Sequence, residues 1–340
     1  MSCFRRSSRP AGWAELRLLR TDIDVKKLRL NKKISVALLM ALLLGSSSCG
    51  VRESSLMRLV PVESCAIMTI DWSVVRADRE LRRLMKGDEF EAVLRHFRIA
   101  SASVNTVTIF SSIDSPTNSG LLLRGSFDRK EITTELKANG FREETLDGHK
   151  VYVNADDYVA MPSNRTLFAG PREGAAGVFR AMDDAKESVV ASAAYNKINA
   201  SMTTKGQPLR AFLLVPQGTL DMADAALTAT SVALSLFNLG GVGELLKAVN
   251  VARGFGVTVA GGAHDKYPVE LCVLMRDEET ARFVSGSLNA MKTISELASS
   301  DVREQESLRA IRQMTIVRKQ EVLAVRMEVP GQALFPPASR

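Results

Sequence analysis

The side chains that could carry catalytic or metal-binding chemistry are few and scattered in this sequence of 340 residues. The three histidines, His96, His149 and His264, have no second ligand at the spacings that zinc sites use, and neither a His-Glu-x-x-His nor a Cys-x-x-Cys motif occurs. There is also no Gly-x-Ser-x-Gly turn for a serine nucleophile and no Walker-type phosphate loop. The local sequence therefore predicts no catalytic residue, no metal site and no cofactor.

Two other patterns give the same result. Adjacent carboxylates occur at Asp156-Asp157 and Asp183-Asp184, but neighbours in a strand or helix point apart and cannot share a proton. The glycines from Gly254 to Gly262 follow a helical stretch and run through a strand, whereas a dinucleotide-binding turn follows a strand and opens a helix. One enzyme alternative stays open, with a noncontiguous site in a cleft between two halves of the chain that uses Asp147, His149 or His264.

The positive charge of the chain is confined to its first segment. The formal net charge is +7, and residues 1–49 contain ten of the Lys and Arg residues but only three acids. The rest of the chain is therefore neutral overall and has no basic excess for a nucleic-acid backbone. Partners of that class are not expected.

An export signal precedes a candidate lipidation site. Lys32 and Lys33 are followed by the uncharged run Ile34 to Leu44 and then by small residues up to Cys49, the three parts of a secretory signal. An apolar helix of eleven residues is too short to cross a bilayer core of about 30 Å. The alternatives are cleavage near Ser48, which would release a soluble protein, and an uncleaved leader. Residues 1–30 are long for such a signal, which suggests a translation start near Leu28 or Leu30 or, as a rival, a mitochondrial transit peptide.

This segment resembles the lipobox of bacterial lipoproteins, although Ser46 stands where that family usually has leucine. The resemblance implies that the thiol of Cys49 is acylated and that Cys49 becomes the first residue after cleavage. Gly50 is not the aspartate that marks inner-membrane retention in enteric bacteria, so the resemblance favours the outer membrane. It places the protein in the cell envelope, facing the periplasm.

The body of the chain reads as two α+β modules with the same order of elements. Apolar runs of strand type begin at Cys65 and Leu209, and each is followed by an interrupted helical stretch, a strand pair and a helix that opens at Asp128 or Asp277. We predict a leader over 1–49, a linker over 50–60, modules over 61–202 and 203–330, and a tail over 331–340. The β-α-β-β-α-β order indicates two tandem ferredoxin-like modules, antiparallel sheets with helices on one face. The pattern resembles poorly characterised cell-envelope lipoproteins with paired modules of this kind.

One apolar segment stands out. Residues 225–243 contain no charged side chain over 19 positions. We interpret the segment first as a helix buried between the modules; the alternatives are an apolar docking surface and, from length alone, a membrane span. The docking alternative names as its contact residues Leu227, Val232, Leu234, Leu236 and Phe237.

The two cysteines of the body lie in apolar strand candidates. Cys65 and Cys272 are predicted to be buried free thiols, with a disulfide between the modules as the alternative. Together these observations predict a non-enzymatic, lipid-anchored envelope protein that binds a protein partner or an apolar ligand.

Overall fold

The computed structural model describes residues 54–78, 82, 90–91, 94, 99–112, 115, 117–202, 207–215, 252–260, 266–297 and 312–330. Within these ranges the strands are β1 (Ala66–Asp71), β2 (Val104–Ser111), β3 (Ser119–Gly125), β4 (Arg142–Leu146), β5 (His149–Asn154), β6 (Asp157–Ser163), β7 (Thr166–Gly170), β8 (Leu209–Leu214), β9 (Ala252–Val259), β10 (Lys266–Met275), β11 (Thr315–Lys319) and β12 (Val322–Pro330). The α-helices are α3 (Ser54–Met57), α4 (Trp72–Ala77), α7 (Arg129–Ala138), α8 (Arg172–Asp183), α9 (Ala193–Ser201) and α12 (Glu278–Leu297).

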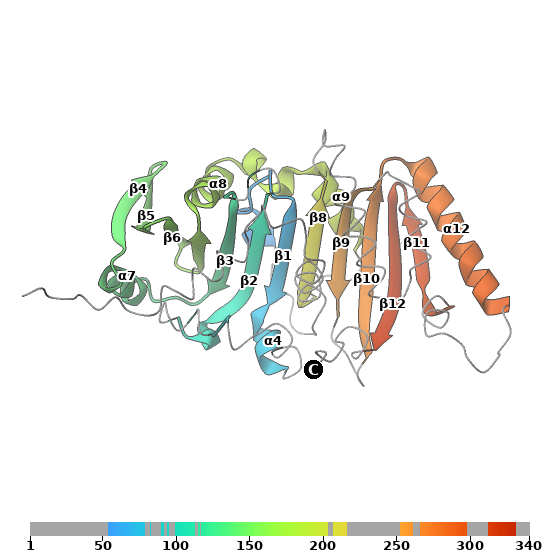
Figure 1. Ribbon diagram of the computed structural model, residues 1–340, viewed down its shortest axis with the longest axis horizontal. Helices are drawn as coiled ribbons and strands as arrows, with labels where there is room; N and C mark the ends of the chain where they lie inside the picture. Colours follow the sequence, from blue (N-terminus) through green and yellow to red (C-terminus); the bar gives the residue numbers. More distant parts are fainter. Residues whose placement is uncertain are drawn as a thin grey trace, which may run out of the picture.

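The strands join in one continuous antiparallel sheet, which confirms the predicted α+β class. Its order is β11-β12-β10-β9-β8-β1-β2-β3-β7-β6-β5-β4, and Figure 1 shows it running from red at one end to green at the other. The two halves of the chain meet where β1 pairs with β8, with Ile67 opposite Phe212 and Ile70 opposite Leu209. The halves therefore share a sheet instead of forming two separate ones.

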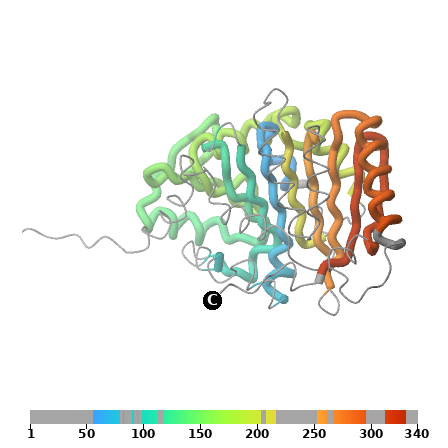
Figure 2. The backbone as a smooth tube through the Cα atoms, turned by 45° about the vertical axis from the view of Figure 1, so that its right-hand side comes forward, coloured from blue at the N-terminus to red at the C-terminus, as the bar shows by residue number. Residues whose placement is uncertain are grey.

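Helices cover both faces of the sheet, not one as predicted. Helices α4, α7 and α12 pack on a core that includes Trp72, Ile132 and Leu288, and we call this side the α12 face. Helices α3, α8 and α9 pack on the opposite side, the α9 face, around residues such as Met57 and Phe168. Figure 2 shows α12 standing in front of the strands at the red end of the sheet. The strands carry apolar side chains on both sides of the sheet, so helices must cover both faces.

The strand order within each half also differs from the prediction. A split β-α-β unit runs its first and second strands parallel, because a helix crosses between them, and inserts its third strand antiparallel between the two. Here β1, β2 and β3 pair in sequence and antiparallel, as do β8, β9 and β10. The last strand of each half, β7 or β12, then pairs with the third strand. The ferredoxin-like order is not confirmed.

The described structure begins at Ser54, inside the predicted linker. Leu56, Met57 and Val60 are buried on the α9 face. The hydroxyl of Ser188 donates to Met57 O at 2.9 Å, and the amide of Val189 donates to Val60 O at 2.8 Å. The boundary predicted at residue 202 is also crossed, because α9, from the first half, packs on β8, β9, β10 and β12 of the second half.

Local signals explain why the helices begin where they do. Asp71 accepts hydrogen bonds from the amides of Ser73 and Val74 at the start of α4. Asp128 does the same for Lys130 and Glu131 at the start of α7. A carboxylate in this position satisfies amides that have no partner inside the helix. These caps fix the ends of helices that lie on the α12 face.

Candidate functional site

Many of the residues singled out from the sequence lie outside the described part of the chain. This holds for the lipidation residue Cys49, for His96 and His264, and for every residue of the predicted docking surface: Leu227, Val232, Leu234, Leu236 and Phe237. These assignments stay predictions.

Asp147 and His149 lie at the far end of the sheet from the junction of the halves. Asp147 and Gly148 form the tight β4–β5 turn, with φ angles of 51° and 81°. His149 Nε2 lies 2.9 Å from Asp183 Oδ2, and the imidazole stacks on Phe179 with ring centroids 4.4 Å apart. Strand β5 is separated from β1 by β6, β7, β3 and β2. The pair therefore joins the outer hairpin to the end of α8 and does not belong to a cleft between the halves.

The two body cysteines are buried and are not joined in a disulfide. Cys272 sits in β10 on the α9 face, and its neighbours in the sheet are Gly256 and Ala324. Burial, followed by the nearby Glu270 carboxylate, raises the pKa of the Cys272 thiol to about 12. A thiol with this pKa is not a nucleophile near neutral pH.

The main polar feature of the described structure is a row of side chains across the sheet, which we call the polar row. Its members stand directly opposite one another on successive strands: Thr108, Thr69, Arg210, Thr258, Glu270, Arg326 and Thr315. Five of them, from Thr108 to Glu270, are buried. Because alternate residues of a strand share a face, the polar row lies on the α9 face with Cys272 and Phe212.

The charged members of the polar row are held by specific partners. Arg326 Nε donates to Glu270 Oε1 at 2.7 Å, and the Glu270 side chain is only 2% exposed. Arg210 is 3% exposed, and its Nη2 donates to Asn199 Oδ1 of α9 at 2.6 Å. The Arg210 guanidinium also lies 5.5 Å from the ring centroid of Phe212. Buried charges require such partners, because removal from water is costly.

The polar row connects the two halves of the chain. Thr69 Oγ1 and Thr108 Oγ1, on β1 and β2, lie within hydrogen-bonding distance at 3.2 Å. Thr69 in turn stands opposite Arg210 on the first strand of the second half. A slip of β8 by one residue would place the Arg210 guanidinium in the apolar core of the α12 face. The row can therefore fix the register between the halves.

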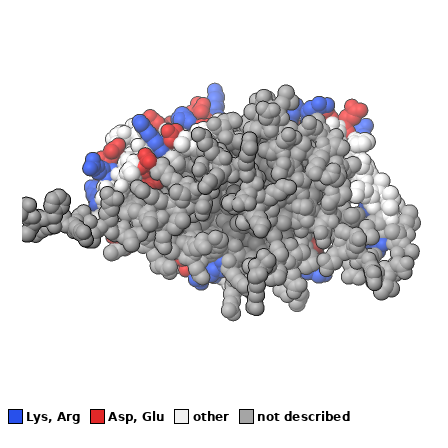
Figure 3. Space-filling view, viewed as in Figure 1, with Lys and Arg blue, Asp and Glu red and all other residues white. Residues whose placement is uncertain are grey.

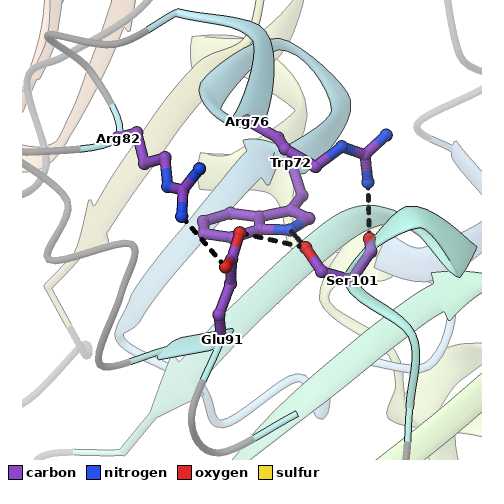
Figure 4. Close-up of polar contacts among 5 residues, drawn as sticks. All are labelled: Trp72, Arg76, Arg82, Glu91 and Ser101. Atoms are coloured by element: carbon purple, nitrogen blue, oxygen red, sulfur yellow. Dashed lines mark hydrogen bonds and ion pairs between the residues drawn. The ribbon is translucent and has the colours of Figure 1, made fainter. Parts of the chain in front are cut away.

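A second polar cluster lies beside α4 (Figure 4). The indole Nε1 of Trp72 donates to Ser101 Oγ at 3.1 Å, and that hydroxyl donates to Glu91 Oε1 at 3.3 Å. Arg82 Nη2 contacts the other oxygen of Glu91 at 3.1 Å, and Arg76 donates to the carbonyl of Ser101. This cluster fastens α4 to the η2 turn (Ser101–Ser103) that precedes β2.

Sequence reasoning missed both clusters. A charged residue inside an apolar strand was the available signal for the polar row: Arg210 within LRAFLL, Glu270 within VELCVLM and Arg326 within VLAVRMEV. Lys, Glu, Arg and Asp are almost never fully buried without a partner. Which residues face one another across strands is not visible in the sequence.

The described residues contain neither a metal-binding cluster nor a membrane-spanning helix. Within the ranges given above, no group of three or more His, Cys, Asp and Glu side chains could hold a metal ion. No helix among them is long and apolar enough to cross a membrane. On the face drawn in Figure 3, the described basic and acidic side chains alternate along the margins instead of separating by sign.

Comparisons with known proteins do not assign the chain to a family. No family model matches the sequence, and no curated protein matches it. Crystal form III of the protein TP0453 aligns with a TM-score of 0.43 and 10% identity, covering 85% of this chain and 96% of that one. Crystal form IV aligns with the same score at 11% identity, covering 82% and 94%.

Proposed function

We propose that this chain is a non-enzymatic lipoprotein of the cell envelope, acylated at Cys49, facing the periplasm, and anchored in the outer membrane in preference to the inner one. The observation that carries the proposal is the leader: a basic segment, an apolar run too short to span a bilayer, and a cysteine after small residues. The described structure supports it, since Leu56, only seven positions after that cysteine, is already buried.

The role of the body is to bind, in this proposal, a protein partner or an apolar ligand. The contact residues proposed for it are those of the charge-free segment, with Leu234 near its centre. The polar clusters of the described residues support a binding role over a catalytic one, because the Arg210, Glu270 and Glu91 side chains are held by partners within the fold. A carboxylate or guanidinium that is held in this way stabilises the fold.

The enzyme alternative ranks second. It needs Asp147, His149 and His264 to converge between the halves, and His149 is instead bound to Asp183 near one end of the sheet. We also propose that the two halves are tandem copies of one unit. In support, each half opens with three strands paired in sequence and a helix, and its last strand, β7 or β12, returns to pair with the third strand. Among the described residues, four strands follow α7 in the first half and two follow α12 in the second.

Acylation is tested by growing cells with a labelled palmitate analogue and isolating the protein. The label should be lost in the Cys49→Ala variant and retained in Cys3→Ala, which removes a cysteine elsewhere in the leader. Loss of the thiol removes the only group to which this chemistry attaches the acyl chain. Label that survives in Cys49→Ala would contradict the proposal.

Binding is tested by crosslinking in native membranes followed by isolation of the chain. The Leu234→Asp variant should lose its crosslinked partner or ligand while its thermal midpoint stays that of the wild type, because a docking residue is not needed for folding. The Leu234→Met variant, which keeps an apolar side chain, serves as the control. A variant that simply unfolds would instead support a helix buried between the halves.

A further inference from the structure

The start of the folded body is fixed tightly to one place on the molecule. Met57 and Val60 are fully buried, and the residues that follow are hydrogen-bonded to the η3 turn (Ala185–Glu187) and the residues after it. The amide of Val62 donates to Glu187 O at 2.8 Å, and the Ser188 hydroxyl donates to Met57 O. Ser54, where the described residues begin, is therefore held beside η3.

Covalent geometry limits how far this point can lie from an acylated cysteine. Five residue steps separate Cys49 from Ser54, and an extended chain covers at most about 3.6 Å per residue, or roughly 18 Å in all. An acyl-modified cysteine sits at the surface of the bilayer, because its lipid chains are in the hydrocarbon core. Ser54 is then held within about 18 Å of the headgroups.

Other parts of the body lie far from the point where the tether joins it. Residue Ala102 lies just before β2, whose far end, Ser111, accepts a hydrogen bond from the amide of Cys65. The eight residues of β2 place Ala102 about 27 Å from that end. Ala290, on α12, lies over the end of the sheet, five strand spacings from β1, or about 24 Å.

We propose that the surface formed by α3 and η3 rests on the lipid headgroups, so that the ends of β1 and β2 near Trp72 and Ala102 point away from the membrane. The inference rests on the proposed acylation of Cys49. Its occupant is a bilayer surface, not a second protein, because the tether joins the body on this side of the molecule and ends at a lipid anchor. Exposed charges of both signs, such as Arg58, Asp184 and Lys186, suit a headgroup layer.

Three matched alanine-to-cysteine substitutions test this orientation: Ala185→Cys in η3, Ala102→Cys and Ala290→Cys, all at exposed positions. The acylated protein from membranes is labelled with a maleimide fluorophore and added to preformed phosphatidylethanolamine and phosphatidylglycerol vesicles whose headgroups carry a nitroxide quencher. Cys65 and Cys272 are buried, and an acylated Cys49 has no free thiol, so the fluorophore reports the introduced site.

The expected result is a loss of fluorescence for Ala185→Cys and no loss for Ala102→Cys or Ala290→Cys, relative to vesicles without nitroxide. Equal quenching at all three positions, or stronger quenching at Ala102→Cys or Ala290→Cys, would overturn the inference. The intact mass of the same preparation reports acylation separately. A protein without the acyl mass would overturn the proposed function and this inference together, whereas an acylated protein with the wrong quenching pattern would overturn the orientation alone.

Discussion

Arg326 Nε donates to Glu270 Oε1 at 2.7 Å across the β10–β12 pair, and the carboxylate that it holds is almost completely buried. The arginine side chain is 34% exposed, so one partner reaches water and the other does not. Such a pair contributes little net stability when it replaces apolar packing, but breaking it leaves a buried charge alone. The pair therefore specifies the pairing of β10 and β12.

The first prediction concerns this pair. Removing the guanidinium in Arg326→Met should lower the free energy of unfolding by about 2 to 3 kcal/mol, because Glu270 keeps its burial but loses its cation. Lys266→Met is the matched control on the same strand pair: its partner Glu328 lies 4.0 Å away and both side chains are about 60% exposed. That change should cost less than about 1 kcal/mol. Equal losses in urea unfolding would contradict the assignment.

The second prediction concerns the packing of α9. A Cβ added at Gly256 would lie 2.0 Å from Met202 Cε and 2.4 Å from Ile198 Cγ2. Gly256→Ala should therefore destabilise the protein by about 1 to 3 kcal/mol, the usual cost of overpacking. Gly286→Ala, on α12, meets no atom within 4 Å and should stabilise by up to about 1 kcal/mol through helix propensity. Thermal midpoints that shift in the same direction for both variants would show that α9 is not packed here.

The third prediction concerns acid stability. Hydrogen bonds from Thr280 first, and then the Arg276 guanidinium, lower the pKa of Asp277 from 3.8 to about 2. A carboxylate with a lowered folded pKa contributes stability that is complete above its unfolded pKa and is lost as the pH falls toward 2.

Asp277→Asn keeps a capping side chain but removes this charge. Its urea midpoint should lie below that of the wild type at about pH 6, and the two should converge as the pH falls through about 2, where Asp277 takes up its proton in the folded protein. A difference between the two proteins that stays constant over this range would contradict the cause given for the lowered pKa.

The fourth prediction concerns thiol reactivity. Cys272 has a pKa of about 12 and both body cysteines are buried. Iodoacetamide at about pH 8 should therefore leave both unmodified in the folded protein and modify both in denaturant, as read by mass spectrometry, because only an exposed thiolate reacts. Rapid modification of Cys272 without denaturant would be inconsistent with its place in the sheet.

The sequence predicted individual elements where apolar periodicity was clear. The strand expected from Leu209 is β8, and the helices expected after Asp128 and Asp277 are α7 and α12. Strand β4 was missed because its residues, REETL, are charged and its first four side chains are exposed. An edge strand can be polar, so it lacks the apolar pattern by which strands are recognised in a sequence.

The arrangement of the elements could not be predicted from the same signals. Pairing between β1 and β8 joins residues about 140 positions apart, for instance Thr69 and Arg210, and no local pattern encodes it. The polar row depends on the register of seven strands, so it becomes visible only when they are aligned. The candidate functional residues were predicted from the leader and from the charge-free segment. Both lie outside the described residues, so these assignments stay predictions.

The most direct test of the central claim is the intact mass of the protein extracted from membranes of cells that make the full chain. The account predicts a chain that begins at Cys49 and carries a mass increment of acyl and glyceryl groups on that residue. Material that still contains Trp13, or that is recovered from the soluble fraction without any lipid mass, would contradict it.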